Sequence, residues 1–136
     1  MKKFISVLSL IALLVCLVAL PAGAAGSDEI MPRWTGVRDV NAFFDFYGTV
    51  GEASLSSTKD SSTSKLEGVM TIYKSVNGQW VYVDSMTQST TRGTLGMLME
   101  IDGISGVEYK MEVEIIAYSG TTVIEEITDV KYATCP

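Results

Sequence analysis

The stretch SGVEYKMEVEIIAYSG, residues 105–120, alternates apolar and polar side chains almost without a break. Every second residue from Val107 to Ala117 is apolar or aromatic, and the residues between them include Glu108, Lys110, Glu112 and Glu114. A period of two places neighbouring side chains on opposite faces of a strand. The stretch therefore predicts a β-strand with one face in a core and an acidic face that is either solvated or a binding site.

Similar patterns occur throughout the chain after residue 24, and none of them has a helical period. Strands are expected at residues 41–48, 50–57, 65–74, 79–86, 94–101, 107–117 and 121–130. Asn77-Gly78, between two of these runs, predicts a type I′ hairpin because both residues tolerate a positive φ. Seven short strands predict an all-β fold, an antiparallel β-sandwich of about seven strands of the immunoglobulin or fibronectin type III kind.

Two aromatic residues have structural roles in this prediction. A strand ending at Ile101, a glycine-containing turn and the run from Gly106 to Val113 resemble a fibronectin type III corner, with Tyr109 as the tyrosine whose hydroxyl ties the corner to upstream backbone. An ordinary buried tyrosine is the alternative. Trp80 is expected to pack between the sheets, although an exposed aromatic strip able to stack on sugar rings is another interpretation.

The N-terminus has the features of a secretory signal peptide. A basic MKK start, an uncharged apolar run and the small residues up to Ala24 predict a signal peptide over residues 1–24 that is cleaved after Ala24. The mature chain would be secreted or associated with the cell envelope, without stable membrane insertion. We expect a linker over residues 25–40, a sandwich domain over 41–132 and a tail over 133–136.

The charge of the mature chain excludes some partners. The whole chain carries a net charge of −6, and removal of the signal peptide takes two lysines and no acid with it. A chain this acidic is a poor match for a nucleic-acid backbone or an anionic lipid surface. Nucleic acid and membrane are therefore not expected as partners.

The mature chain retains one cysteine, Cys135, because Cys16 lies in the signal peptide. A lone cysteine in an exported protein suggests an intermolecular disulfide, here a covalent homodimer or envelope subunit. A frayed terminus with an incidental thiol is the alternative.

The residues offer little catalytic chemistry. Absence of histidine removes Ser-His-Asp and Cys-His catalysis, and no nucleotide-binding or metalloprotease motif occurs. Glu112 or Glu114 can meet Glu126 across a hairpin, as a small carboxylate-dependent hydrolase would need. Ca²⁺ is a weaker expectation, because no loop carries the spaced acids of such a site. We therefore expect a protein that is not an enzyme and has no cofactor.

A series of motifs over roughly residues 50–130 resembles small exported proteins of gut-type Gram-positive bacteria, a family of unknown function. The shared elements are L-x-G-x-M-x-I-Y-K at 66–74, the Asn-Gly turn, W-x-x-V at 80–83, S-G-x-x-Y-x-x-x-V at 105–113, Ser119-Gly120 and T-x-x-E-x-I-T at 122–128. The resemblance implies an exported single β-sandwich and assigns no catalytic residue. We expect a module that binds a protein or glycan through the Ser/Thr-rich loop 56–64, the link 87–93 or a sheet edge.

Overall fold

The computed structural model describes residues 34–136, and its regular structure there consists entirely of β-strands. The strands are β1 (Val37–Tyr47), β2 (Val50–Lys59), β3 (Lys65–Val76), β4 (Gln79–Thr90), β5 (Thr94–Asp102), β6 (Glu108–Ser119) and β7 (Thr122–Thr134). The predicted signal peptide and residues 25–33 of the predicted linker lie outside the described residues. In the part that is described, no helix meets the length and hydropathy needed to cross a membrane.

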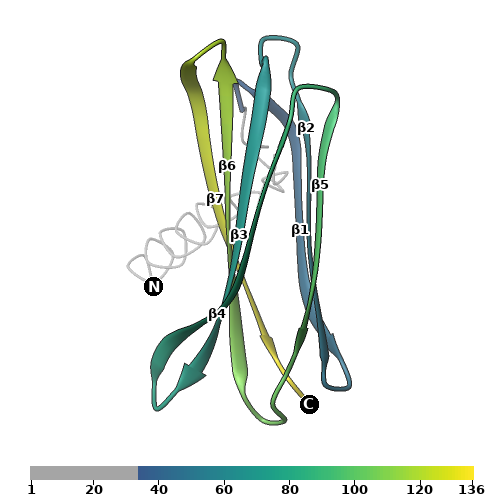
Figure 1. Cartoon of the computed structure of the whole chain (residues 1–136), viewed down its shortest axis with the longest axis vertical. Coiled ribbons are helices and arrows are strands. Elements are labelled where there is room, and N and C mark those ends of the chain that lie inside the picture. The colour runs from purple at the N-terminus through teal and green to yellow at the C-terminus, as the bar shows by residue number, and fades with distance from the viewer. Residues whose placement is uncertain (1–33) are drawn as a thin grey trace, which may run out of the picture. The chain divides into compact units, whose positions relative to one another are not determined.

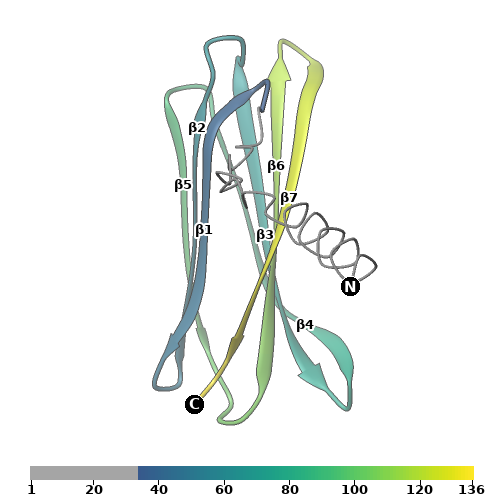
Figure 2. The same ribbon diagram turned by 180° about the vertical axis from the view of Figure 1, so that it is seen from behind.

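The strands form two antiparallel sheets that face each other (Figures 1 and 2). One sheet has the order β1-β2-β5 and the other has the order β4-β3-β6-β7. The fourth strand pairs with β3, whereas in a constant immunoglobulin domain it joins the sheet of the first, second and fifth strands. The all-β, seven-stranded sandwich predicted from the sequence is confirmed, in the arrangement associated with fibronectin type III domains.

The core lies between the sheets and follows the alternation in the sequence. Residues 109, 111, 113, 115 and 117 of β6 are all buried, and β5 buries Leu95, Met97, Met99 and Ile101 in the same way. The remaining core residues include Phe44, Phe46, Ala53, Leu55, Leu66, Met70 and Ile72. Because each strand places only one face in this core, the other face of each sheet is left to meet solvent.

The lower end of the sandwich is closed around Tyr109. Its side chain is buried, and its hydroxyl accepts a 2.9 Å hydrogen bond from the backbone N–H of Ile104, the contact expected of a tyrosine corner. Its ring lies 5.0 Å from that of Phe46 in β1, measured between centroids. The corner before β6 is thereby attached to both sheets.

Cys135 lies in the same closure, so the alternative of a frayed terminus is wrong, and the predicted tail over residues 133–136 begins inside β7. β7 continues to Thr134, the Cys135 N–H donates to Val107 O at 3.0 Å, and the Cys135 carbonyl accepts from Gly106 N–H at 2.8 Å. The thiol is fully buried. These hydrogen bonds extend the β7 pairing to the end of the chain, where an apolar thiol fills the space beside Gly103.

The predicted linker also ends earlier than expected. β1 begins at Val37, and Trp34 packs partly against the core. Gly36 donates its N–H to Glu125 at 2.6 Å and accepts a 2.6 Å hydrogen bond from the buried Thr63 hydroxyl. Residues 34–40 therefore belong to the domain, because these contacts satisfy backbone groups that a free linker would leave to water.

Candidate functional site

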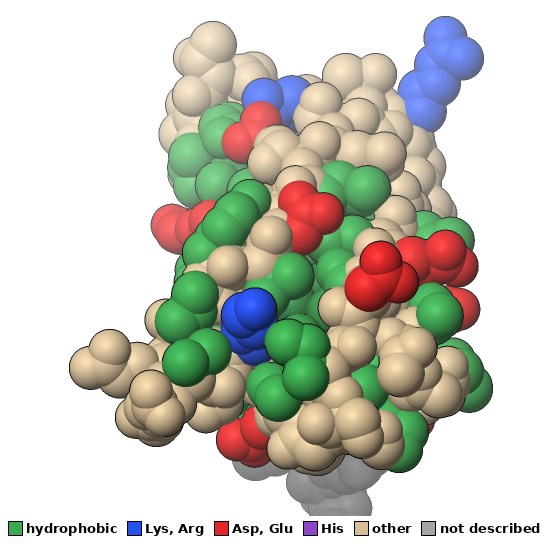
Figure 3. Space-filling view, turned by 60° about the horizontal axis from the view of Figure 1, so that its bottom comes forward, with side chains coloured by type: hydrophobic (Ala, Val, Ile, Leu, Met, Phe, Trp, Pro, Cys, Tyr) green, Lys and Arg blue, Asp and Glu red, His purple; other side chains and the backbone are tan. Residues whose placement is uncertain are grey.

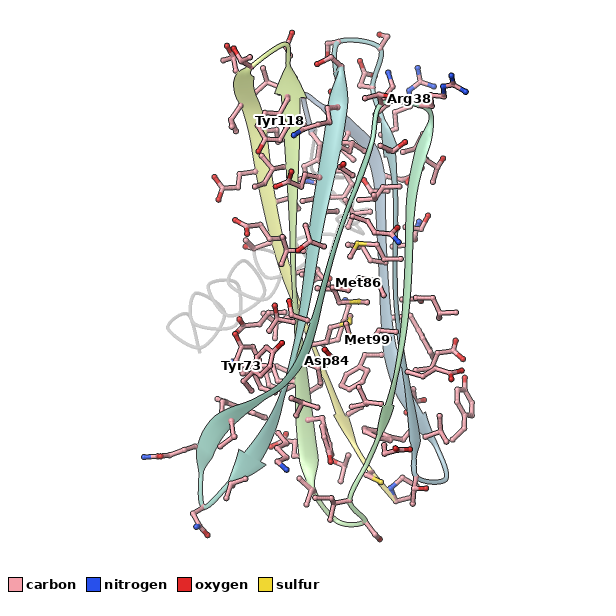
Figure 4. All side chains as sticks on the ribbon, in the orientation of Figure 1. Arg38, Tyr73, Asp84, Met86, Met99 and Tyr118 are labelled. Carbon is pink, nitrogen blue, oxygen red and sulfur yellow. The ribbon has the colours of Figure 1, made fainter. Side chains whose placement is uncertain are left out.

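Four aromatic side chains gather around one lysine on the outer face of the four-stranded sheet. We call them the aromatic cluster: Tyr73 of β3, Trp80 and Tyr82 of β4, and Tyr132 of β7. Tyr82, Tyr73, Lys110 and Tyr132 form one row across all four strands, because each is the register partner of the next. Figure 4 shows Tyr73 on the opposite side of β3 from Met86 and Met99, which lie between the sheets.

The prediction that Trp80 packs in the core is wrong, because the hairpin turn fixes its direction. Asn77 and Gly78 have φ values of 53° and 78°, as a type I′ turn requires, so Val76 pairs with Gln79 and Ser75 with Trp80. Ser75 shares the outer face with Tyr73, two residues away. Trp80 therefore faces outward and is 38% exposed.

A bulge further along β4 returns the strand to the core. Ile72 pairs with Asp84 and Tyr73 with Tyr82, so Val83 is the extra residue. This one-residue shift places Met86 opposite Met70, facing inward, while Tyr82 stays outward. The β3–β4 hairpin projects from the lower end of the sandwich in Figure 1. Trp80 and Tyr82 lie at the start of β4, next to the Asn77-Gly78 turn of this hairpin.

Lys110 occupies the middle of the aromatic cluster. Its ammonium nitrogen lies 4.8 Å from the centroid of the Tyr73 ring, 5.0 Å from that of Trp80 and 2.6 Å from Glu112 Oε1. The lysine side chain is only 13% exposed, although it stands on the outer face of a sheet. A cation close to two aromatic faces is attracted by their negative quadrupoles, so Lys110 holds the rings in place.

The rings themselves remain accessible. Tyr82 is 58% exposed and Tyr132 is 59% exposed. Tyr73 and Tyr82 meet edge to face at 6.4 Å, and Trp80 and Tyr132 are tilted at 5.9 Å. Aromatic pairs in these geometries attract one another, so the cluster is ordered before any ligand arrives. Ordered and exposed aromatic rings are typical of binding surfaces.

The candidate carboxylates lie beside the cluster on the same face. Glu114 meets Glu126, and a hydrogen bond between the two carboxyl groups raises the pKa of Glu114 above its ordinary value. Partial desolvation and the negative charges of Glu126 and Glu67 raise it further. A groove of about 280 Å³, lined partly by Glu112, Glu114 and Thr128, runs along this face.

The geometry of this pair fits poorly with glycoside hydrolysis. In glycosidases the two catalytic carboxyl groups stand roughly 5 to 9.5 Å apart, and this separation leaves room for the scissile bond. Two carboxyl groups that hydrogen bond to each other lie closer than that. Among residues 34–136, no three acidic or cysteine side chains converge as metal ligands. Of the two predicted partners of Glu126, Glu114 is the one that meets it, and the pair lies on an open face.

The two predicted recognition loops are shorter than expected. Residues 56–59 belong to β2 and residues 87–90 to β4, which leaves only short turns between strands. In the first turn, Asp60 accepts hydrogen bonds from the Ser62 N–H and the Ser61 hydroxyl, and these contacts, with Arg38 nearby, lower the pKa of Asp60. Thr63 is buried, so most of the predicted loop is structural.

A second hollow, of about 730 Å³, is lined by residues of β1, β2 and β5 and by Asp129 and Lys131 of β7. Phe43 is the only aromatic residue lining it, and Ser54, Ser56 and Gly96 contribute small side chains. It is larger than the groove beside the aromatic cluster, but it offers no comparable group of rings. The aromatic cluster is therefore the better candidate site.

No protein-family model matches the chain, and no curated protein matches it either. The fold and the cluster define the chain as a fibronectin type III-like β-sandwich with an exposed aromatic surface. The resemblance to exported Gram-positive proteins rests on the sequence motifs alone.

Proposed function

We propose that this chain is a non-enzymatic β-sandwich module, exported by a cleavable signal peptide, that binds a protein or a glycan at the cell envelope or outside it. The N-terminal sequence pattern supports export, and the motifs shared with small Gram-positive exported proteins support the envelope setting. The absence of histidine supports a binding role over catalysis.

One observation carries the binding proposal: Trp80, Tyr82 and Tyr132 expose their rings side by side on a rigid sheet. Single exposed aromatic side chains, such as Phe43 and Tyr47 of the other sheet, are common on protein surfaces, whereas three rings exposed together are typical of an interaction site. Their exposure is explained if a ligand covers them.

The binding test compares two triple variants. The first replaces Trp80, Tyr82 and Tyr132 with alanine, and the second replaces the exposed Phe43, Tyr47 and Leu98 of the other sheet. Isolated Gram-positive cell walls, with and without protease treatment, serve as the probe in a sedimentation assay. We expect the first variant to lose binding and the second to retain it. Equal binding by both variants would contradict the proposal.

The export proposal has a separate test, the intact non-reduced mass of the chain recovered from culture medium and from the envelope. If the chain is cleaved after Ala24, its measured mass should equal that of residues 25–136. An uncleaved chain confined to the membrane fraction would contradict it. A doubled mass that disappears on reduction would establish the Cys135-linked dimer, which requires the buried thiol to leave the sandwich.

A small carboxylate-dependent hydrolase is the second candidate function, and the raised pKa of Glu114 favours it. In that case Glu114 would act as the general acid and Glu126 as its partner. Hydrolysis of a soluble glycan that is abolished by Glu114→Gln, with the fold intact, would support this candidate. Hydrolysis that survives the substitution would exclude it.

A further inference from the structure

The aromatic cluster already contains its own cation. Lys110 lies within 5.0 Å of two ring centroids and pairs with Glu112. A second ammonium or guanidinium group placed on Trp80 would meet rings whose quadrupole is already engaged and a positive charge close by. The site is therefore poorly suited to a ligand that binds through a cation.

The surroundings of the cluster disfavour an anion as well. Glu108 and Glu112 flank Lys110 on the outer face. Glu114 is the next outward-facing residue of β6, and Glu126 lies opposite Ile116, one outward-facing position beyond it. Lys110 already pairs with Glu112, so its ammonium group is not free to pair with an anionic ligand. Figure 3, which looks toward the lower end of the molecule, shows acidic side chains at several places among hydrophobic ones and few basic ones. An anionic polymer would be repelled here.

The composition of the cluster also separates a glycan from a protein partner. A stable protein interface buries about 800 Å² on each side and keeps charged residues out of its centre. Here a Lys110–Glu112 ion pair stands in the middle of the rings. Rings with polar groups between them suit a pyranose, whose C–H faces stack on aromatic rings while its hydroxyl groups bond to Glu112 and Thr71 nearby.

We propose that the aromatic cluster binds a neutral glycan, with Trp80 and Tyr132 stacking on its sugar rings and Lys110 excluding cationic ligands. The inference rests on the proposed binding function and narrows it to one ligand class. Trp80 and Tyr132 lie 5.9 Å apart, so together they offer a surface for more than a single ring.

The test measures depletion of the exported chain from solution by polysaccharides of different charge. Cellulose, β-1,3-glucan, mannan and starch are the neutral probes, polygalacturonate is the anionic probe, and chitosan and oligolysine are the cationic probes. We expect no binding to polygalacturonate, binding to chitosan or oligolysine only at low salt because the acidic residues attract them, and binding to at least one neutral probe. Binding to the neutral probe should be insensitive to salt between about 0.05 and 0.5 M, because no charge is exchanged.

The variants assign the binding to the cluster. Trp80→Ala and Tyr132→Ala should each weaken the affinity about tenfold or more, and Phe43→Ala on the other sheet should leave it unchanged. Lys110→Met should bind the neutral probe more weakly, because the rings lose the cation that holds them in place, and should gain salt-resistant binding to chitosan or oligolysine. The inference would be overturned if the chain bound only charged probes or no probe at all. It would also be overturned if Trp80→Ala bound the neutral probe as strongly as the parent chain.

The polysaccharide test and the cell-wall test together distinguish failure of the neutral-glycan inference from failure of the proposed binding function. If cell-wall binding depends on the three rings but is destroyed by protease, the ligand is a protein: the binding function stands and the neutral-glycan inference is wrong. If cell-wall binding does not depend on the rings, both are wrong.

Discussion

The ammonium nitrogen of Lys110 lies 5.0 Å from the centroid of the Trp80 ring, although 30 residues separate the two in sequence. The relationship depends on two features of the chain: the Asn77-Gly78 turn, which sends Trp80 outward, and the β3–β6 pairing, which places Lys110 beside Tyr73. The contact between Lys110 and Trp80 links the β3–β4 hairpin to β6, in the middle of the four-stranded sheet. Lys110 thus has a structural role as well as the selective role proposed above.

Replacing Lys110 with methionine removes the charge but retains the apolar stem of the side chain. We expect a loss of about 1 kcal/mol in the free energy of unfolding, from two cation–π contacts and one half-exposed ion pair. Urea denaturation measures it. The matched control is Lys131→Met, which loses only the exposed ion pair with Asp129 and should change stability by less than about 0.5 kcal/mol. Equal losses of stability in Lys110→Met and Lys131→Met would show that the cation–π contacts of Lys110 do not stabilise the fold.

Replacing Tyr109 with phenylalanine tests the corner. The Ile104 N–H would lose its acceptor, so we expect the free energy of unfolding to fall by about 1–3 kcal/mol. Tyr82→Phe removes an exposed hydroxyl of the same kind and should stay within about 0.5 kcal/mol of the parent chain. Thermal and urea unfolding report both. A Tyr109→Phe chain as stable as the parent would show that water satisfies the Ile104 amide.

The pKa of Glu114 predicts a pH dependence of stability. Because this pKa is raised in the folded state, folding is favoured while Glu114 is protonated, and that stability is lost as the pH rises through the raised pKa. Glu114→Gln should therefore stabilise the chain at neutral pH by about 0.5 kcal/mol, a value limited by solvent screening. The gain should shrink as the pH falls below the ordinary glutamate pKa.

A double substitution checks the cause of that effect. Adding Glu126→Gln to Glu114→Gln should contribute little further stability at neutral pH, because the repulsion between the two carboxylates is already gone. Urea denaturation of the four chains at neutral and acidic pH completes the cycle. Additive gains would show that the two side chains do not interact.

The burial of Cys135 predicts slow reaction of its thiol. Alkylation by a maleimide reagent should be negligible in the folded chain and complete in denaturant, because the thiol has no exposed surface. Mass spectrometry over time measures the modified fraction. Rapid modification under native conditions would mean that the end of β7 opens readily, as an intermolecular disulfide would require.

The sequence predicted the strands that bury one face and expose the other. In β6 and β5, a period of two extends over almost the whole strand, and both strands lie as expected. Tyr109 followed from the spacing of a corner motif. These features are local, so one segment of sequence contains the information that defines them.

The predictions that failed depended on pairing between segments. Trp80 was assigned to the core from its residue type, whereas counting from the Asn77-Gly78 turn places it opposite the outward-facing Ser75. The bulge at Val83, which later turns β4 inward, leaves no clear mark in the sequence. An exposed aromatic strip was only the alternative interpretation, because the members of the aromatic cluster come from β3, β4 and β7 and meet only through register.

Cys135 and the Ser/Thr-rich segment show a second limit. Polar composition and a terminal position predicted a loop and a tail, but residues 56–59 continue β2 and Cys135 fills the lower end of the core. Composition reports average solvation, whereas a backbone hydrogen bond to a neighbouring strand can order any residue that can adopt an extended conformation.

The most direct test of the account is a fluorescence titration of the Trp34→Phe chain, in which Trp80 is the only tryptophan that remains. Soluble oligosaccharides from the neutral polysaccharide that binds are added while Trp80 emission is recorded. A saturable change in emission that Tyr132→Ala weakens would establish a neutral glycan on the aromatic cluster. Emission that stays constant with every oligosaccharide would contradict the central claim.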